Sequence, residues 1–168
     1  LSCPLLAQDF TINNISISGN ERTKDFVILR EILIHEGDTF ELSSLYKAME
    51  TSENRLLNLN LFNKVDITIE PLGYNKPMNV KITVIEKWTI WPIPFVEFSD
   101  RNFNVWSNLN FDPERTNYGL YVFNYNLFGR NHTLKTKMKT GYNTKLGVEY
   151  RMPFLSKTSQ WGLITLIE

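Results

Sequence analysis

The stretch HTLKTKMKTGYNTKLGVEYRM, residues 132–152, decides the expected fold. Apolar or small side chains alternate here with charged ones, so that Leu134, Thr136 and Met138 are interleaved with lysines. A period of two is the period of a β-strand, whose successive side chains point to opposite faces. The interruption around Tyr142 predicts a turn. We therefore expect two antiparallel strands, each with one apolar and one charged face.

The register of this hairpin follows from its turn. A turn centred on Tyr142 sets Lys135 opposite Glu149 and Lys139 opposite Lys145. The apolar pairs are then Leu134 with Tyr150 and Met138 with Leu146. Two lysines that face each other are tolerable only near a wet strand end, so we expect this turn at the outer rim of a sheet.

The environment of the two faces is a separate question. In a soluble sandwich the apolar face would point into a core, whereas in an outer-membrane barrel it faces lipid and the charged face lines a watery lumen. Alternation alone does not distinguish these cases. The residues expected on the lumen face are Lys135, Lys137, Lys139, Glu149 and Arg151. The lysine row could instead bind an anionic substrate or lipid headgroups, but a hydrated lumen wall is favoured.

Composition excludes several function classes. The 168 residues include 18 basic and 18 acidic ones, so the chain lacks the basic excess that nucleic-acid binding needs, and no nucleic-acid partner is expected. No run of about 18 apolar residues exists to form a membrane helix. Aromatic residues make up 13% of the chain, which suits the aromatic girdles of a barrel and equally a sticky soluble module.

The sequence offers little chemistry. His35 and His132 are isolated, and the glycines lie in turns, so we expect no catalytic site, no metal and no cofactor. The acidic residues between positions 31 and 41 could form a calcium cluster. A solvated surface between two helices is the favoured interpretation of this charge run.

The first eight residues are expected to be the remnant of a signal peptide. LSCPLLAQ, residues 1–8, is apolar with a small residue near its end, as before a secretory cleavage site. Cys3 could instead carry the lipid of a lipoprotein, but Leu1 fits that motif poorly.

Residues 9–86 predict a compact α/β module. Residues 11–18 alternate as a strand and end at a Gly-Asn turn. Thr23 is the expected cap of a first helix, and a second helix is expected from Leu42. Residues 64–70 and 79–86 alternate again, which predicts two more strands. The order is strand, helix, helix, strand, strand.

Four motifs give this pattern a family resemblance. Gly-Asn-Glu-Arg-Thr at 19–23, Glu-Gly-Asp at 36–38 and Asn-Leu-Phe-Asn-Lys-Val at 60–65 resemble the turns of a POTRA (polypeptide-transport-associated) domain. Asn60 replaces a usual glycine, and asparagine tolerates positive φ. Asn-Leu-Phe-Gly-Arg-Asn at 126–131 and Tyr-Arg-Met-Pro-Phe-Leu at 150–155 resemble the first barrel strands of the BamA/TamA-type outer-membrane protein assembly family.

The resemblance implies an α+β POTRA domain (βααββ), followed by the first antiparallel strands of a transmembrane β-barrel that is incomplete here. We expect the POTRA domain at 9–86, a linker at the membrane interface at 87–94 and barrel strands at 95–168. Pro92 and Pro94 argue against a regular central strand in the linker. Aromatic residues at the near turns, with Trp88 and Trp91, should form one girdle, and Tyr142 should lie at the opposite end. A first outer loop is expected within 100–117. About five strands fall short of the eight that a bacterial barrel needs, so a fragment is expected.

The resemblance also implies a function, which is the assembly or insertion of outer-membrane proteins. Unfolded outer-membrane protein clients would bind an edge strand of the POTRA domain, with outer-membrane lipids and accessory lipoproteins as further partners. The expected location is the outer membrane, with the POTRA domain in the periplasm. Expected client-binding residues are Lys64, Asp66, Thr68 and Glu70. Expected gate residues on the first barrel strand are Ile93, Phe95, Glu97 and Ser99.

Two other functions stay open at this point. A two-partner secretion pore shares the POTRA domain and the barrel, although such pores usually carry two POTRA domains and a plug helix. A soluble, strand-rich binding domain would share the alternation alone. A monomer found in the detergent-free soluble fraction would favour the soluble domain.

Overall fold

The computed structural model describes residues 9–73, 77–98, 116–155 and 161–167. The chain divides into two compact units, Leu1–Trp88 and Thr89–Glu168. Within the described ranges, no helix combines the length and the apolar character that a membrane span requires. The expected signal remnant, residues 100–115 of the range expected to hold the first outer loop, and Ser99 lie outside the described residues, whereas Thr116 and Asn117 begin β6.

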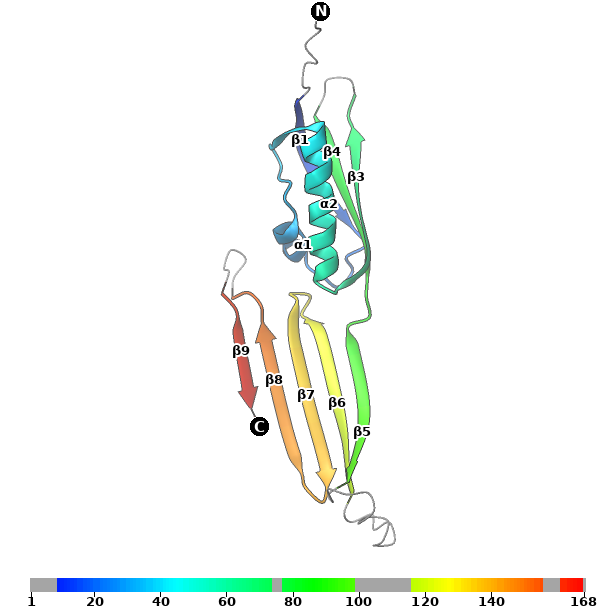
Figure 1. The fold of residues 1–168 in the computed structure, drawn as a ribbon, viewed down its shortest axis with the longest axis vertical. Helices are drawn as coiled ribbons and strands as arrows, with labels where there is room; N and C mark the ends of the chain where they lie inside the picture. The colour runs from blue at the N-terminus through cyan, green and yellow to red at the C-terminus, as the bar shows by residue number, and fades with distance from the viewer. Residues whose placement is uncertain (1–8, 74–76, 99–115, 156–160, 168) are drawn as a thin grey trace, which may run out of the picture. The chain divides into compact units, whose positions relative to one another are not determined.

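The first unit is a four-stranded sheet with two helices (Figure 1). Its elements are β1 (Asp9–Ser18), α1 (Asp25–Glu31), β2 (Thr39–Glu41), α2 (Leu42–Asn58), β3 (Phe62–Pro71) and β4 (Met78–Glu86). The strand order is β2-β1-β4-β3, with β1 parallel to β4 and the other neighbours antiparallel. The expected order of strand, helix, helix, strand, strand is confirmed, with the short β2 added between the helices.

The core lies between the helices and one face of the sheet. The helix α2 buries Leu45, Met49 and Leu56, which lie on one side of a 3.6-residue period. The strands β3 and β4 bury alternate residues against it, among them Ile67 and Ile82. Each such apolar side chain contributes about 1.5–3 kcal/mol when fully buried. The alternation seen in the sequence is therefore the signature of a sheet covered on one face.

The start of α1 differs from the expectation. Its N-cap is Lys24, one residue after the expected cap Thr23, and Lys24 makes no side-chain capping hydrogen bond. Thr23 is buried, and the backbone N–H groups of Arg22 and Thr23 donate to the two carboxylate oxygens of Glu86, at 3.0 and 2.6 Å. The turn is thus fixed by a carboxylate at the end of β4, about sixty residues away, which local sequence could not reveal.

Two turns of this unit confirm their motifs. Asn60 has a φ of 58°, so asparagine holds the positive φ that a glycine would otherwise supply. At Gly19 the φ is 87°, and a Cβ atom there would collide with the carbonyl oxygen of Val84. Only glycine fits this close approach between the end of β1 and β4.

The second unit is a five-stranded antiparallel meander (Figure 1). Its strands, in both chain and spatial order, are β5 (Ile90–Phe98), β6 (Thr116–Leu127), β7 (His132–Gly141), β8 (Lys145–Met152) and β9 (Leu163–Ile167). The predicted register of the β7–β8 hairpin is confirmed in every pair, including Lys139 opposite Lys145. The meander places Phe128, in the turn between β6 and β7, at the sheet end where β5 begins, and Tyr142, in the turn between β7 and β8, at the other end, as expected.

The first strand of this sheet begins earlier than expected. Because β5 starts at Ile90, the expected linker at 87–94 is wrong for its second half, and the barrel strands begin before residue 95. Pro92 and Pro94 are accommodated because β5 is an edge strand, whose only neighbour among the described strands is β6. A proline that directs its nitrogen away from the neighbour removes no ladder hydrogen bond.

The turn between β6 and β7 explains the barrel motif at residues 126–131. Phe128, Gly129 and Asn131 all have positive φ, between 58° and 69°. Asn126 holds this turn, because its carbonyl oxygen accepts from the N–H of Gly129 and its side-chain oxygen accepts from the N–H of Asn131. Glycine and asparagine tolerate positive φ at positions 129 and 131, whereas Phe128 adopts it within the same turn.

Candidate functional site

Two open sheet edges are the candidate site. One edge is β3 in the first unit, and the other is β5 in the second. An edge strand presents backbone N–H and C=O groups that a further strand can pair with. The expectation that residues 64–70 form an edge is confirmed by the strand order.

The direction of the backbone groups on β3 follows from one hydrogen bond. The N–H of Ile67 donates to Oε1 of Glu53 on α2, at 3.0 Å, so it points away from β4. Outward and inward groups alternate along an antiparallel pair. Val65, Ile67 and Ile69 therefore turn their N–H groups to the open edge. Pro71 also faces the open edge by this alternation, but proline has no N–H group to offer.

This direction corrects the expected client-binding residues. The backbone groups of Lys64, Asp66, Thr68 and Glu70 pair with β4 and are not available to a further strand. Their side chains are exposed on the open face of the sheet. The pairing groups of this edge belong to the neighbours Val65 and Ile69, whose N–H groups have no acceptor within the described part of the chain.

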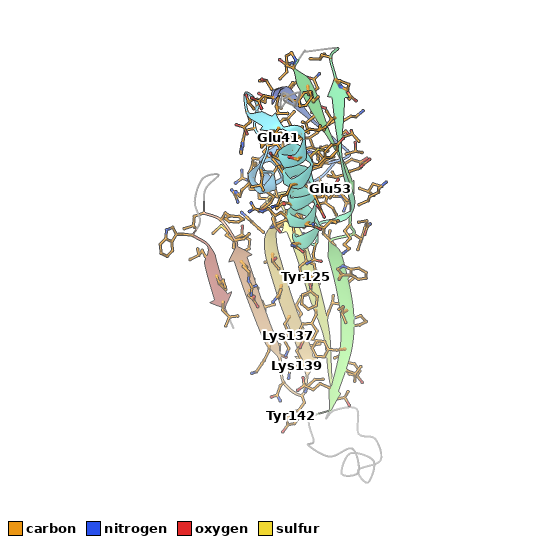
Figure 2. All side chains as sticks on the ribbon, turned by 45° about the horizontal axis from the view of Figure 1, so that its top comes forward. Glu41, Glu53, Tyr125, Lys137, Lys139 and Tyr142 are labelled. Carbon is orange, nitrogen blue, oxygen red and sulfur yellow. The ribbon has the colours of Figure 1, made fainter. Side chains whose placement is uncertain are left out.

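Glu53 is a residue of this edge that the sequence did not single out. Figure 2 labels it on α2, the helix that packs beside β3. Its carboxylate satisfies the central outward donor of the edge without a strand. Nothing in the local pattern of α2 marks Glu53, because it is one of two acidic residues within that helix, the other being Glu50.

The direction of the backbone N–H and C=O groups on β5 also follows from one hydrogen bond. The N–H of Tyr125 donates to the carbonyl oxygen of Thr89, at 3.0 Å, and these two residues extend the β5–β6 register. By alternation, Trp91, Ile93, Phe95 and Glu97 direct their backbone groups to β6. The open edge is formed by the groups of Pro92, Pro94, Val96 and Phe98.

This result corrects the expected gate residues. Ile93, Phe95 and Glu97 cannot pair with a further strand through their backbone, and Ser99 lies outside the described residues. On the open edge, Pro92 and Pro94 offer carbonyl oxygens and no N–H. Val96 and Phe98 offer both groups. The half of the edge nearest the first unit in sequence is therefore poor in donors.

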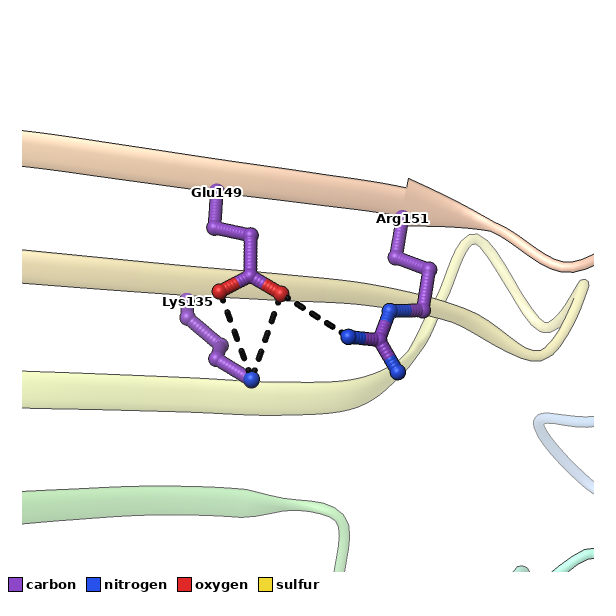
Figure 3. A network of polar contacts seen from close by, with 3 residues as sticks. All are labelled: Lys135, Glu149 and Arg151. Carbon is purple, nitrogen blue, oxygen red and sulfur yellow. Dashed lines mark hydrogen bonds and ion pairs between the residues drawn. The ribbon is translucent and has the colours of Figure 1, made fainter. Parts of the chain in front are cut away.

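The charged residues expected on one face are brought together there. Lys135 Nζ lies 3.2 and 3.3 Å from the two carboxylate oxygens of Glu149, and Arg151 lies 3.2 Å from Oε1 of the same carboxylate (Figure 3). Lys139 Nζ lies 3.2 Å from Oε2 of Glu97 on β5. Figure 2 shows Lys137 and Lys139 along β7.

Aromatic rings share this face. The rings of Phe95 and Tyr121 lie 4.5 Å apart, and Lys137 Nζ lies 5.7 and 5.3 Å from their centroids. A Cβ atom on Gly119 would collide with the ring of Phe95, so this ring occupies the space that a side chain would fill. An aromatic ring that covers a cross-strand glycine helps to fix the register of an edge strand.

The opposite face of the sheet is apolar. The residues that alternate along the strands with those of the charged face are exposed on it, including Val96, Met138, Leu146 and Ile167. A sheet with one exposed apolar face and one charged face has the pattern of a membrane barrel wall. The short β9 departs from this alternation, since Ile164 and Leu166 are apolar on the charged face.

Across the ranges that the structure describes, no group of three or more His, Cys, Asp or Glu side chains is arranged to hold a metal ion. The acidic residues near position 36 act on the backbone instead. Asp38 accepts from the N–H of His35 at 2.8 Å, and Glu36 accepts from the N–H of Ile15 at 3.2 Å.

Comparison with known proteins agrees with this architecture. Residues 10–87 match the POTRA family, described as surface antigen variable number repeat. The outer membrane protein assembly factor BamA of Nitratidesulfovibrio vulgaris is 34% identical over 82 residues, which are 49% of this chain and 10% of that protein. BamA of Neorickettsia risticii is 39% identical over 74 residues, which are 44% of this chain and 10% of that protein.

A solved structure shares the fold of both units. The crystal structure of BamA from Haemophilus ducreyi lacking POTRA domains 1–3 superposes with a TM-score of 0.63 at 15% identity. The match covers 89% of this chain and 26% of that chain. The chain therefore combines a POTRA domain with a sheet like the start of the BamA barrel. It belongs to the BamA/TamA-type outer-membrane protein assembly family. It spans about a tenth of the curated relatives that it matches.

Proposed function

We propose that this chain assists the assembly of outer-membrane proteins by pairing its two open edges with extended segments of unfolded clients. The observation that supports the proposal is the pair of edge strands β3 and β5, each of which turns backbone groups outward with no partner strand in the described ranges of the chain. The two BamA relatives are named as outer membrane protein assembly factors, and this supports a role in assembly for this chain.

In this proposal the POTRA domain lies in the periplasm and the five-stranded sheet lies in the outer membrane, with its apolar face toward lipid. The residues Lys135, Lys137, Lys139, Glu149 and Arg151 then line a hydrated lumen. Accessory lipoproteins are further proposed partners. The exposed apolar face is what supports placement against lipid, because water would otherwise contact it along its whole length.

The driving force is hydrogen bonding rather than a covalent reaction. An unpaired N–H or C=O group in hydrocarbon costs several kcal/mol, so a client that enters the membrane gains when its backbone pairs with the β5 edge. At β3, in the aqueous periplasm, each such hydrogen bond contributes only about 0.5–1.5 kcal/mol. At β3 the client would pair with Val65 and Ile69, and it would compete with Glu53 for the N–H of Ile67. At β5 it would pair mainly with Val96 and Phe98.

The test uses a photo-crosslinking residue in place of Thr68, whose exposed side chain lies one residue from the proposed contacts. The chain is incubated with an unfolded outer-membrane protein, with and without Ile69→Pro. This substitution removes an outward N–H and leaves the pairing with β4 intact. Crosslinking should fall several-fold, whereas Ile69→Val, the matched control, should retain it. Undiminished crosslinking in folded Ile69→Pro would show that clients bind elsewhere.

A further inference from the structure

The apolar face of the second unit is hollowed near one end of the sheet. The hollow is a groove of about 450 Å³ over β6, β7 and the first residues of β8. Figure 2 labels Tyr142 in the turn between β7 and β8, which marks this end of the sheet. The described residues that line the groove include none from β3 or β5. The groove is therefore distinct from both edges at which clients are proposed to pair.

The floor of the groove is one apolar rung across three strands. Leu120 on β6 pairs with Met138 on β7, and Met138 pairs with Leu146 on β8. Met138 is 41% exposed and Leu146 is 61% exposed. Hydrocarbon that covers such side chains removes apolar area from water, which is favourable. The floor is therefore suited to a hydrocarbon chain.

The next rung toward the sheet end carries hydroxyl groups. Tyr118 on β6 pairs with Thr140 on β7, and Thr144 lies just before β8. All three residues line the groove, and none of their hydroxyl groups has a hydrogen-bond partner among the described residues. Residues two apart on a strand are separated by about 6.6 Å, so this rung directly adjoins the apolar one. The groove thus changes from hydrocarbon to hydroxyl groups toward the sheet end.

The same end carries an excess of positive charge. Lys145 begins β8 directly opposite Lys139, and both residues line the groove. Lys139 pairs with Glu97 at 3.2 Å, whereas Lys145 has no carboxylate partner in the part of the chain that the structure describes. None of the described lining residues is acidic. Two facing lysines therefore share one carboxylate, and an anion beside Lys145 would compensate the second charge.

We propose that this groove, here called the Met138 groove, binds an anionic phospholipid. One acyl chain lies across the apolar rung of Leu120, Met138 and Leu146. The hydroxyl groups of Thr140 and Thr144 donate to the phosphate, and Lys145 pairs with its charge. The inference rests on the proposed function in one respect, because it takes the apolar face to be directed toward lipid.

The position of Lys145 allows this contact. By register Lys145 belongs to the charged face, but it is the first residue of its strand. A lysine has a four-carbon stem, which can lie along apolar surface while the ammonium group reaches a polar layer. At the sheet end that layer is accessible from either face. A tyrosine such as Tyr118 is also typical of the level at which lipid headgroups lie.

The charge of the headgroup should decide which lipid binds. A phosphatidylglycerol headgroup carries a net negative charge that Lys145 can neutralise. A phosphatidylcholine headgroup brings its own cation next to Lys145, which weakens the attraction of the phosphate. Because the ion pair is exposed to water, we expect a preference of about threefold for phosphatidylglycerol.

The experiment uses the whole chain in non-ionic maltoside micelles, with amide and methyl NMR as the readout. Phosphatidylglycerol and phosphatidylcholine with identical acyl chains are titrated separately. Phosphatidylglycerol should give saturable shifts at the amides of Thr140, Thr144 and Lys145 and at the methyl groups of Leu146. Inorganic phosphate, which has the anion without a chain, should give no saturable shift at these positions.

Three variants separate the contributions. Lys145→Gln should abolish the preference between the two lipids. Thr144→Val removes one hydroxyl group at similar volume, and should weaken phosphatidylglycerol about twofold. Lys47→Gln, at an exposed position of α2, removes one positive charge from the first unit and should leave the preference unchanged. Client crosslinking at Thr68 should be the same in Lys145→Gln as in the unsubstituted chain.

Equal affinity for the two lipids, or shifts spread evenly over the apolar face, would overturn the Met138 groove and leave the placement of that face toward lipid intact. Saturable binding of inorganic phosphate at the same amides would show a site for a free anion and would also overturn the proposal. Absence of lipid-induced shifts from the whole apolar face would contradict the placement itself, and the groove with it.

Discussion

Lys139 on β7 reaches across β6 to Glu97 on β5, with 3.2 Å between Nζ and Oε2. The lysine side chain is only 8% exposed, whereas that of Glu97 is 49% exposed. This contact explains how Lys139 tolerates Lys145 directly opposite. The like charges are compensated by a carboxylate two strands away, rather than by a wet strand end alone.

Glu97→Gln should therefore destabilise the second unit. The substitution leaves the buried ammonium group of Lys139 without its carboxylate, at a cost of about 1–2 kcal/mol, reduced by the exposure of Glu97. Thermal unfolding in detergent measures the change. Glu70→Gln is the control, because the Glu70–Lys81 pair is exposed and 3.9 Å long, and its loss should cost below about 0.5 kcal/mol. Equal costs would contradict a structural role for the buried pair.

Glu53→Ala should open the centre of the β3 edge. The N–H of Ile67 loses its acceptor, so its hydrogen exchange should accelerate and client crosslinking at Thr68 should increase. The fold should survive, at a cost of about 1 kcal/mol for the lost hydrogen bond. Glu50→Ala, on an exposed part of the same helix, is the matched control and should change neither quantity. Reduced crosslinking in Glu53→Ala would mean that the carboxylate helps to bind clients.

Pro92→Val combined with Pro94→Val should extend pairing along β5. The two substitutions restore outward N–H groups and keep apolar side chains. In outer membranes, crosslinks from a partner strand should then form near residues 92–94 as well as near Val96. Crosslinks that reach residues 92–94 in the unsubstituted protein with equal yield would show that the prolines do not limit pairing.

Val148→Arg tests which face meets lipid. Val148 lies on the apolar face, so a charge there should impair membrane insertion by about 2–4 kcal/mol at the midplane. Lys137→Gln, on the charged face, should cost below about 1 kcal/mol, since an uncharged polar side chain remains compatible with a hydrated face; the substitution removes the contacts of the ammonium group with the rings of Phe95 and Tyr121. Insertion assays into lipid vesicles compare the two. Similar losses in both variants would contradict the assigned facing.

The sequence predicted those features that depend on local period and turn chemistry. The β7–β8 register was predictable because a turn centred on Tyr142 determines every pair. The positive φ of Asn60 was predictable because the motif places asparagine where glycine is usual. The POTRA order followed from periods of 2 and 3.6 within short segments.

The phase of the backbone groups was not predictable in the same way. Lys64, Asp66, Thr68 and Glu70 were chosen because their side chains are polar, but the outward N–H groups belong to their neighbours. Which residues of β3 direct their N–H groups outward depends on the register with β4, the neighbouring strand. In β3 the outward residues are identified by the hydrogen bond from the N–H of Ile67 to Glu53. Pro92 was placed in a linker because proline argues against a central strand. The sequence does not show the sheet order, and it is this order that puts Pro92 on an edge strand.

The most direct test of the central claim is hydrogen exchange of individual amides when an extended client peptide is added to the whole chain in detergent. The account predicts that exchange slows at Val65 and Ile69 on β3 and at Val96 on β5, because these N–H groups gain acceptors. The amide of Thr68 should not change, since it already pairs with β4. Unchanged exchange at Val65, Ile69 and Val96 under conditions where the peptide binds would contradict pairing at the open edges.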